Sequence, residues 1–191
     1  VKVLVKEDFE GLMPGDKLAE KGASYWTTWN KKPGTAEDAE IVELEGNKCA
    51  HLTYGIDQVL LLGDEQSGVY DLEFDILPAW WGDYVGVGFD ADGDGNILQG
   101  MTDGDGGVYL RVAGSGNDNH PNIMLPDGTD LVVSNYRQEG WARYKMSFDF
   151  SGYGGQGSLT VFVKDFDGNN WGEWMQLAEA TALNMGMTPG S

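Results

Sequence analysis

Apolar and polar side chains alternate along much of the chain. In VYDLEFDIL (69–77), every second residue from Tyr70 to Ile76 is apolar, and the residues between them are acidic. WARYKMSFDF (141–150) and SLTVFVKD (158–165) alternate with the same period. A period of two is typical of a β-strand with one buried face. The inward set is therefore expected to form the core: Leu72, Phe74, Ile76, Tyr144, Met146, Phe148, Val161 and Val163.

The rest of the chain predicts more short strands and little helix. Clusters of Gly, Asp and Asn separate the apolar segments, as turns require. Helical patterns are confined to LAEKGAS (18–24) and LAEATAL (177–183), each with room for a turn or two, and nothing resembling a strand is expected after Leu177. This pattern predicts an all-β fold, either an antiparallel sandwich or a closed barrel, in a single domain over 1–191. Further strands are expected at 1–5, 41–45, 48–54, 57–62, 84–89, 96–99, 108–112, 130–134 and 171–177.

Composition narrows the choice of partners. The 191 residues include 31 Asp and Glu against 12 Lys and Arg, a formal charge of −19. Nucleic acid and anionic membrane surfaces would be repelled, as would acidic glycans unless a cation bridges them. No apolar run is long enough for membrane insertion. A single cysteine, Cys49, excludes an internal disulfide.

Four segments in this order resemble a known family: EDFEG (7–11), WTTWNKKPGTAEDA (26–39), LLGDEQSGVYDLEFDI (61–76) and WARYKMSFDF (141–150). They are similar to the concanavalin A-like lectin/glucanase jelly rolls, and most of all to laminin-G-like and carbohydrate-binding modules of secreted bacterial polysaccharide-degrading enzymes. The resemblance implies that the fold is an antiparallel two-sheet β-sandwich (jelly roll). It also implies a secreted, extracellular, monomeric module attached to a larger enzyme or surface protein.

The chain ends also bear on that resemblance. The sequence starts at Val1 without Met and ends in MTPGS, so we expect a piece of a longer, processed protein. Domains of this family close with a strand that returns beside the first one, and no such strand is expected here. A calcium site that combines Glu10 with a C-terminal carboxylate, which the resemblance would otherwise imply, is therefore in doubt.

The acidic residues of 69–77 can be compared with the catalytic motif of glucanases. Retaining glucanases of the similar fold carry Glu-x-Asp-x-x-Glu on one strand, with the first Glu as nucleophile and the last as general acid/base. Here the matching positions are Glu73, Asp75 and Pro78. Proline can neither donate nor accept a proton, which removes acid catalysis worth roughly 10²–10⁴-fold. The two histidines, His51 and His120, fit structural roles at least as well as that of a base. We therefore expect no catalytic residues.

Aromatic residues near loops and strand ends are candidates for sugar binding. The C–H face of a pyranose packs on a flat ring, and carboxylates accept hydrogen bonds from its hydroxyls. Trp80 and Trp81 follow Pro78, and neighbouring strand residues point to opposite faces unless the proline bends the chain. The expected carbohydrate-binding residues are Trp81, Trp80, Tyr84, Trp26, Trp29, Glu73 and Asp75.

FDADGDGNIL (89–98) resembles half of a calcium-binding loop. Asp90, Asp92 and Asp94 occupy alternate positions, Asn96 follows, and Gly95 stands at the turn. Such a loop folds oxygen ligands around a hard cation. The twelfth position, however, is Met101 instead of a bidentate carboxylate. A structural Ca²⁺ ion and a plain acidic hairpin turn therefore both remain open.

The resulting hypothesis is a non-catalytic carbohydrate-binding module that holds a plant or microbial polysaccharide or oligosaccharide. A cell-surface adhesin or protein-interaction domain is one alternative, which a large apolar patch without a sugar-sized groove would favour. A divergent polysaccharide lyase or glycoside hydrolase is another. The loop at 114–122 is a further candidate rim for a site.

Overall fold

The computed structural model describes residues 2–63, 67–78, 83–89, 106–112, 120–151, 157–181, 183 and 185. The chain divides into two compact units, residues 1–65 and 66–191. Whether the two act as the single domain expected over 1–191 stays a prediction.

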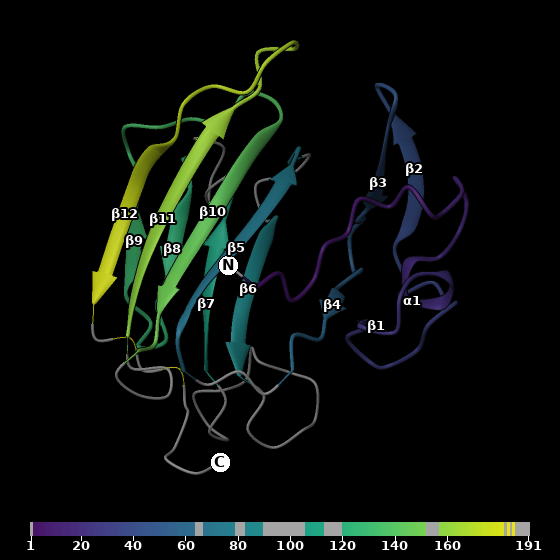
Figure 1. The fold of residues 1–191 in the computed structure, drawn as a ribbon, viewed down its shortest axis with the longest axis horizontal. Coiled ribbons are helices and arrows are strands. Elements are labelled where there is room, and N and C mark those ends of the chain that lie inside the picture. Colours follow the sequence, from purple (N-terminus) through teal and green to yellow (C-terminus); the bar gives the residue numbers. More distant parts are fainter. Residues whose placement is uncertain are drawn as a thin grey trace. The chain divides into compact units, whose positions relative to one another are not determined.

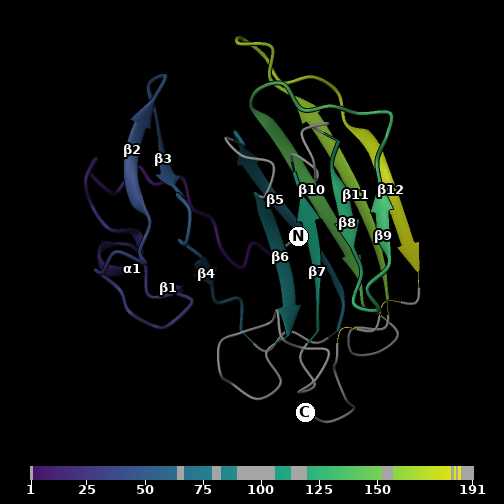
Figure 2. The same ribbon diagram turned by 180° about the vertical axis from the view of Figure 1, so that it is seen from behind.

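The second unit is a β-sandwich of two four-stranded antiparallel sheets, and Figures 1 and 2 show the sheets as two layers. One layer, here called the β10 sheet, has the order β12-β11-β10-β5. The other, the β7 sheet, has the order β6-β7-β8-β9. The strands of the β10 sheet are β5 (Val69–Ile76), β10 (Ala142–Asp149), β11 (Ser158–Asp165) and β12 (Met175–Thr181). Those of the β7 sheet are β6 (Tyr84–Phe89), β7 (Gly106–Arg111), β8 (Asn122–Met124) and β9 (Asp130–Val132).

The core lies between the two sheets, where apolar side chains of alternate residues meet. Tyr144, Met146 and Val163 are fully buried and pack with Val108 and Leu110 of the β7 sheet. The predicted core is confirmed, although its residues differ in how deeply they are buried. Leu72, Phe74 and Ile76 are half-buried and pack against the core, because β5 is an edge strand of its sheet; Tyr144, Met146, Phe148, Val161 and Val163 are buried.

The first unit is smaller and has its own core. Its elements are α1 (Leu18–Lys21), the strand pair β1 (Trp26–Thr28) and β4 (Gln58–Leu60), and the pair β2 (Glu40–Leu44) and β3 (Asn47–His51). Leu18 and Ile41 are fully buried in it. The buried carboxylate of Asp38 accepts hydrogen bonds from the backbone N–H groups of Ala19 (2.8 Å), Glu20 (3.1 Å) and Gly34 (2.9 Å), so its charge is well satisfied.

Most predicted strands are confirmed, and two local predictions are wrong. Residues 2–5 form no strand. The segment 177–183, expected to be helical, instead runs largely in β12, which also overturns the expectation that no strand follows Leu177. Its good helix formers are overridden because Ala178 and Ala180 face the core beside β11. The short strands β1 and β8 were not predicted, and 96–99 lies outside the described residues.

The predicted fold class, an all-β two-sheet antiparallel sandwich, is confirmed. Within the described ranges, no helix has the length and apolar character needed to cross a membrane.

Candidate functional site

Several predicted site residues lie outside the described part of the chain. They are Trp80 and Trp81 of the expected sugar site, and the expected calcium ligands Asp90, Asp92, Asp94 and Asn96. Most of the loop at 114–122 lies outside it as well. These assignments stay predictions.

Trp26 and Trp29 belong to the first unit and are half-buried. The indole N–H of Trp26 donates to Glu7 Oε2 (3.1 Å), and its ring packs against Phe9 with centroids 6.4 Å apart. Glu7 also accepts the hydroxyl hydrogen of Tyr25 (3.1 Å), whose pKa is raised by burial and by that bond. Trp26 therefore has an evident structural role.

Glu73 and Asp75 stand on the exposed outer face of β5, as the alternation predicted. Asp75 is not free to serve a ligand alone, because Arg143 donates to both of its oxygens, from Nε (2.5 Å) and from Nη2 (2.7 Å). This bond raises the pKa of Arg143. Glu73 stands directly across from Lys145 on β10.

Tyr84 is separated from these carboxylates by the sandwich. It is the first residue of β6 and is 39% exposed. Its ring meets that of Tyr109 edge-on, at 6.1 Å and 82°. Because Val87 of the same strand faces the core, Tyr84 stands on the outer face of the β7 sheet. Tyr84 and the carboxylates of β5 thus lie on the outer faces of different sheets.

Two other indoles lie over the outer face of the β10 sheet and rest on three cations. The Arg143 guanidinium carbon is 4.5 Å from the ring centroid of Trp171. The Nζ atoms of Lys164 and Lys145 are 4.5 and 5.0 Å from that of Trp174. Such cation–π contacts are each worth about 0.5–1 kcal/mol at exposed positions. We call these five residues the indole–cation layer.

The connection from β11 to β12 places both indoles. Gly168 takes a left-handed φ of 95°, which glycine adopts without strain. Asp167 Oδ1 accepts hydrogen bonds from the backbone N–H groups of Asn169 (2.8 Å) and Asn170 (2.7 Å). The ring of Phe166 then contacts that of Trp171, with centroids 5.1 Å apart. The connection is therefore an ordered, hydrogen-bonded turn, and it places its aromatic side chains over the outer face of the β10 sheet.

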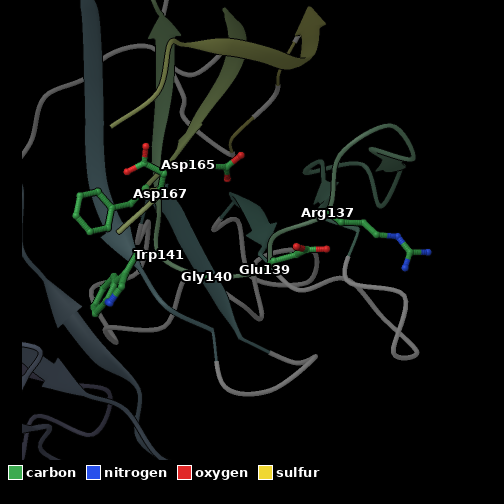
Figure 3. A pocket seen from close by; sticks show the side chains of 7 residues that line it. Arg137, Glu139, Gly140, Trp141, Asp165 and Asp167 are labelled. Carbon is green, nitrogen blue, oxygen red and sulfur yellow. The ribbon is translucent and has the colours of Figure 1, made fainter. Parts of the chain in front are cut away.

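A hollow of about 310 Å³ adjoins this turn, at the end of the sandwich where β10 begins and β11 ends. Figure 3 shows Trp141 and Arg137 toward opposite ends of its lining, with Glu139 between them. The lining combines two aromatic rings, three carboxylates, a guanidinium and a glycine: Trp141, Phe166, Asp165, Asp167, Glu139, Arg137 and Gly140. We call this feature the end hollow.

Hydrogen bonds from Tyr136 and Gln138 fix the residues that line the end hollow. The Tyr136 hydroxyl donates to Asp165 Oδ1 (2.5 Å). Burial, together with this bond, raises the pKa of Tyr136, which therefore stays a neutral donor. Gln138 accepts the hydroxyl hydrogen of buried Tyr144 (2.9 Å) and donates to the carbonyls of Ile76 (2.9 Å) and Gly140 (2.8 Å). Preorganised acceptors of this kind lose little entropy when a ligand binds.

His120 is also tied into this region. Its Nδ1 lies 2.7 Å from the Tyr136 carbonyl, so that nitrogen carries the proton and donates. Its Nε2 accepts from Arg137 Nε (3.3 Å). Both ring nitrogens are therefore engaged, and His120 links the Tyr136 carbonyl to the Arg137 guanidinium.

Sequence reasoning did not select the residues of the end hollow or the indole–cation layer. A signal was present, since Trp171 and Trp174 follow a strand closely, and Arg143, Lys145 and Lys164 occupy outward positions of two alternating segments. The register of β10 with β11, which brings Arg143 opposite Lys164, was needed to gather them.

No protein-family model, curated protein or solved structure matches the chain. The site must therefore be interpreted from its chemistry. Among the described residues, no group of three potential metal-binding side chains is close enough to hold an ion. What the surface offers is aromatic faces, carboxylate acceptors and cationic donors in fixed positions, which suits recognition of a polar ring.

Proposed function

We propose that the protein is a non-catalytic carbohydrate-binding module that holds a polysaccharide at the end hollow and the adjoining indole–cation layer. The observation that carries this proposal is the composition of the end hollow. A pyranose needs an aromatic surface for its C–H face and fixed acceptors for its hydroxyls. Trp141 and Phe166 supply the first, and Asp165, Asp167 and Glu139 supply the second.

The proposed site is longer than one sugar unit. Phe166 of the end hollow contacts Trp171 of the indole–cation layer, so the aromatic surfaces are continuous. A continuous row of rings and polar groups suits an extended chain better than a single sugar. We therefore propose a polysaccharide or a long oligosaccharide as the partner. We further propose that the sandwich is a concanavalin A-like jelly roll, with which its two antiparallel sheets are compatible. We also propose that it is a secreted module of a larger enzyme or surface protein.

The absence of catalysis is part of this proposal. Pro78 follows β5 where a glucanase would carry its acid/base. Asp75 accepts hydrogen bonds from two N–H groups of the Arg143 guanidinium, at Nε and Nη2, so both of its oxygens are already engaged. A structural Ca²⁺ ion at Asp90, Asp92, Asp94 and Asn96 remains part of the proposal too.

Binding to immobilised polysaccharides, with reducing-end release measured in parallel, tests the proposal. Asp167→Asn removes one carboxylate from the end hollow yet keeps the acceptor oxygen of its turn. Asp127→Asn is the matched control, because Asp127 Oδ1 caps the β8–β9 turn in the same way, through the N–H of Thr129 (2.9 Å), outside the end hollow. We expect Asp167→Asn to weaken binding and Asp127→Asn to leave it unchanged, with no reducing ends released. Equal effects of both variants would refute this site, and reducing-end release would refute the non-catalytic assignment.

A further inference from the structure

Carboxylates outnumber cations in the second unit. Residues 66–191 contain 18 Asp and Glu residues against five Lys and Arg residues. Three of those cations, Arg143, Lys145 and Lys164, lie against the rings of the indole–cation layer. Within the described ranges, no ion pair includes a carboxylate of the end hollow. The negative charge of the end hollow is therefore open to a cationic ligand.

The three carboxylates of the end hollow keep free acceptor oxygens. Tyr136 bonds to Oδ1 of Asp165, and the amides of the turn bond to Oδ1 of Asp167. The Oδ2 atom of each accepts no hydrogen bond from the part of the chain that the structure describes, and Glu139 accepts none there with either oxygen. All three residues are exposed, so a ligand can reach them from solvent.

The positive charge of the lining, on Arg137, is turned away from the two aspartates. Arg137 Nε donates to His120 Nε2 (3.3 Å). Figure 3 shows the Arg137 side chain directed away from Asp165 and Asp167. The guanidinium therefore does not occupy the space in front of those carboxylates.

The end hollow suits an organic cation better than a metal ion. No three potential metal-binding side chains of the described residues lie close enough together to hold an ion. The volume of about 310 Å³ instead falls within the range of small-molecule pockets. Trp141 and Phe166 belong to the same lining, so the ligand should combine positive charge with an apolar face.

We propose that the end hollow selects a protonated amino sugar, the unit of a polyglucosamine chain. This ligand class rests on the proposed function, because it names the sugar held at that same site. The amino group of glucosamine is equatorial and projects from the edge of the ring. The C–H face can therefore pack against Trp141 or Phe166 while the ammonium group meets the carboxylates. Charge-assisted hydrogen bonds of this kind are about twice as strong as those of a neutral hydroxyl.

The test compares three oligosaccharides of equal length with the same backbone and linkage. They differ only in the group at one ring carbon, which is ammonium in chitosan oligomers, acetamide in chitin oligomers and hydroxyl in cellulose oligomers. Isothermal titration calorimetry at about pH 5.5 keeps the amines protonated and stays above about pH 4, the usual pKa of Asp and Glu side chains. We expect the native protein to bind the chitosan oligomers at least about tenfold more tightly than the other two.

Substitutions at Glu139 test the charge of the end hollow without removing a described hydrogen bond. Glu139→Gln keeps an acceptor oxygen, so it should lower the preference for chitosan oligomers about two- to fivefold and leave the affinity for cellulose oligomers unchanged. Glu139→Asp keeps the charge and should keep most of the preference. Glu179→Gln makes the same charge change at an exposed residue of β12, opposite Thr160 and toward the other end of β11 from Asp165, and should have no effect.

The outcomes separate the choice of sugar from carbohydrate binding as such. Equal affinity for the three oligosaccharides, or a preference that Glu139→Gln leaves intact, overturns the amino-sugar assignment and leaves carbohydrate binding in place. Equally tight binding of a lysine oligomer with the same number of ammonium groups also overturns it, since charge alone would then suffice. Failure to bind these oligosaccharides and every immobilised polysaccharide overturns the proposed function itself.

Discussion

The two faces of the β10 sheet carry different chemistry on the same strands. Toward the core, β10 and β11 present Tyr144, Met146, Phe148, Val161 and Val163, all buried. Toward the outside, alternate residues of the same strands present Arg143, Lys145, Ser147, Phe162 and Lys164, all half-buried. The same alternation therefore places apolar residues in the core and the residues of the candidate site on the outer face.

The difference teaches which interactions serve stability and which remain available for binding. Inward side chains are enclosed by other apolar groups, so removing one leaves a cavity. Outward side chains contact Trp171, Trp174, one another and the carboxylates of Asp71 and Asp75, and they stay half-buried. Removing one therefore exposes its neighbours to water. Inner-face substitutions should therefore change the free energy of unfolding, and outer-face substitutions should chiefly change ligand affinity.

The largest expected effect compares two phenylalanines on opposite faces. Phe148→Ala should lower the free energy of unfolding by about 3–5 kcal/mol, because it removes a ring that is 2% exposed and leaves a cavity. Phe162→Ala, on the neighbouring strand but on the outer face, should cost less than about half as much, since its site opens to solvent. Urea unfolding of both variants measures the contrast. Equal losses would show that the two faces do not differ in this way.

Next in size is the bond beneath the end hollow. The hydrogen bond from Tyr136 to the Asp165 carboxylate should contribute about 1.5–3 kcal/mol. A double-mutant cycle with Tyr136→Phe and Asp165→Ala isolates that coupling. Coupling below about 0.5 kcal/mol would mean that Tyr136 does not anchor the lining of the end hollow.

The third prediction concerns the β7 sheet, where calcium is expected to change stability but not glycan affinity. The predicted ligand loop joins β6 to β7, so a bound ion should stabilise the fold without changing affinity at the β10 sheet. Stabilisation of about 1–2 kcal/mol is expected when free calcium exceeds its dissociation constant roughly tenfold. Asp92→Ala should remove this response in thermal melting. An identical melting curve in excess chelator and in calcium would favour the plain acidic turn.

The smallest expected effect is the loss of stability at low pH that comes from Asp149. The pKa of Asp149 is lowered, because its carboxylate accepts hydrogen bonds from the Ser151 hydroxyl and backbone N–H. A lowered folded-state pKa gives stability that is present above about pH 4, the unfolded value, and is lost as pH falls through the folded value. The stability difference between native protein and Asp149→Asn should therefore shrink from pH 6 to about pH 2.5. A difference that does not change with pH would contradict this account.

The alternation of apolar and polar residues predicted the sandwich and its inward residues, because a period of two reports directly which face of a strand is buried. The helical prediction for 177–183 was wrong, because the core contacts of Ala178 and Ala180 hold most of this segment in β12. Local propensity does not include such tertiary contacts.

The candidate site was harder to predict for a related reason. Glu73 and Asp75 were placed correctly on an exposed face, but their partners come from residues about 70 positions farther along. Strand register brings Arg143 to Asp75 and Lys145 to Glu73, and the turn after β11 brings Trp171 over Arg143. None of these pairings is visible as spacing in the sequence.

The most direct test of the central claim is to titrate the protein with a fragment of a polysaccharide that it binds. ¹H–¹⁵N NMR follows the seven indole N–H signals. Single Trp→Phe variants assign each signal. The account predicts that the signals of Trp141, Trp171 and Trp174 shift in a saturable way, and that the signal of Trp26, whose N–H donates to Glu7, stays in place. Saturable shifts that leave Trp141, Trp171 and Trp174 unmoved while other indoles respond would contradict it, because the glycan would then bind elsewhere on the protein.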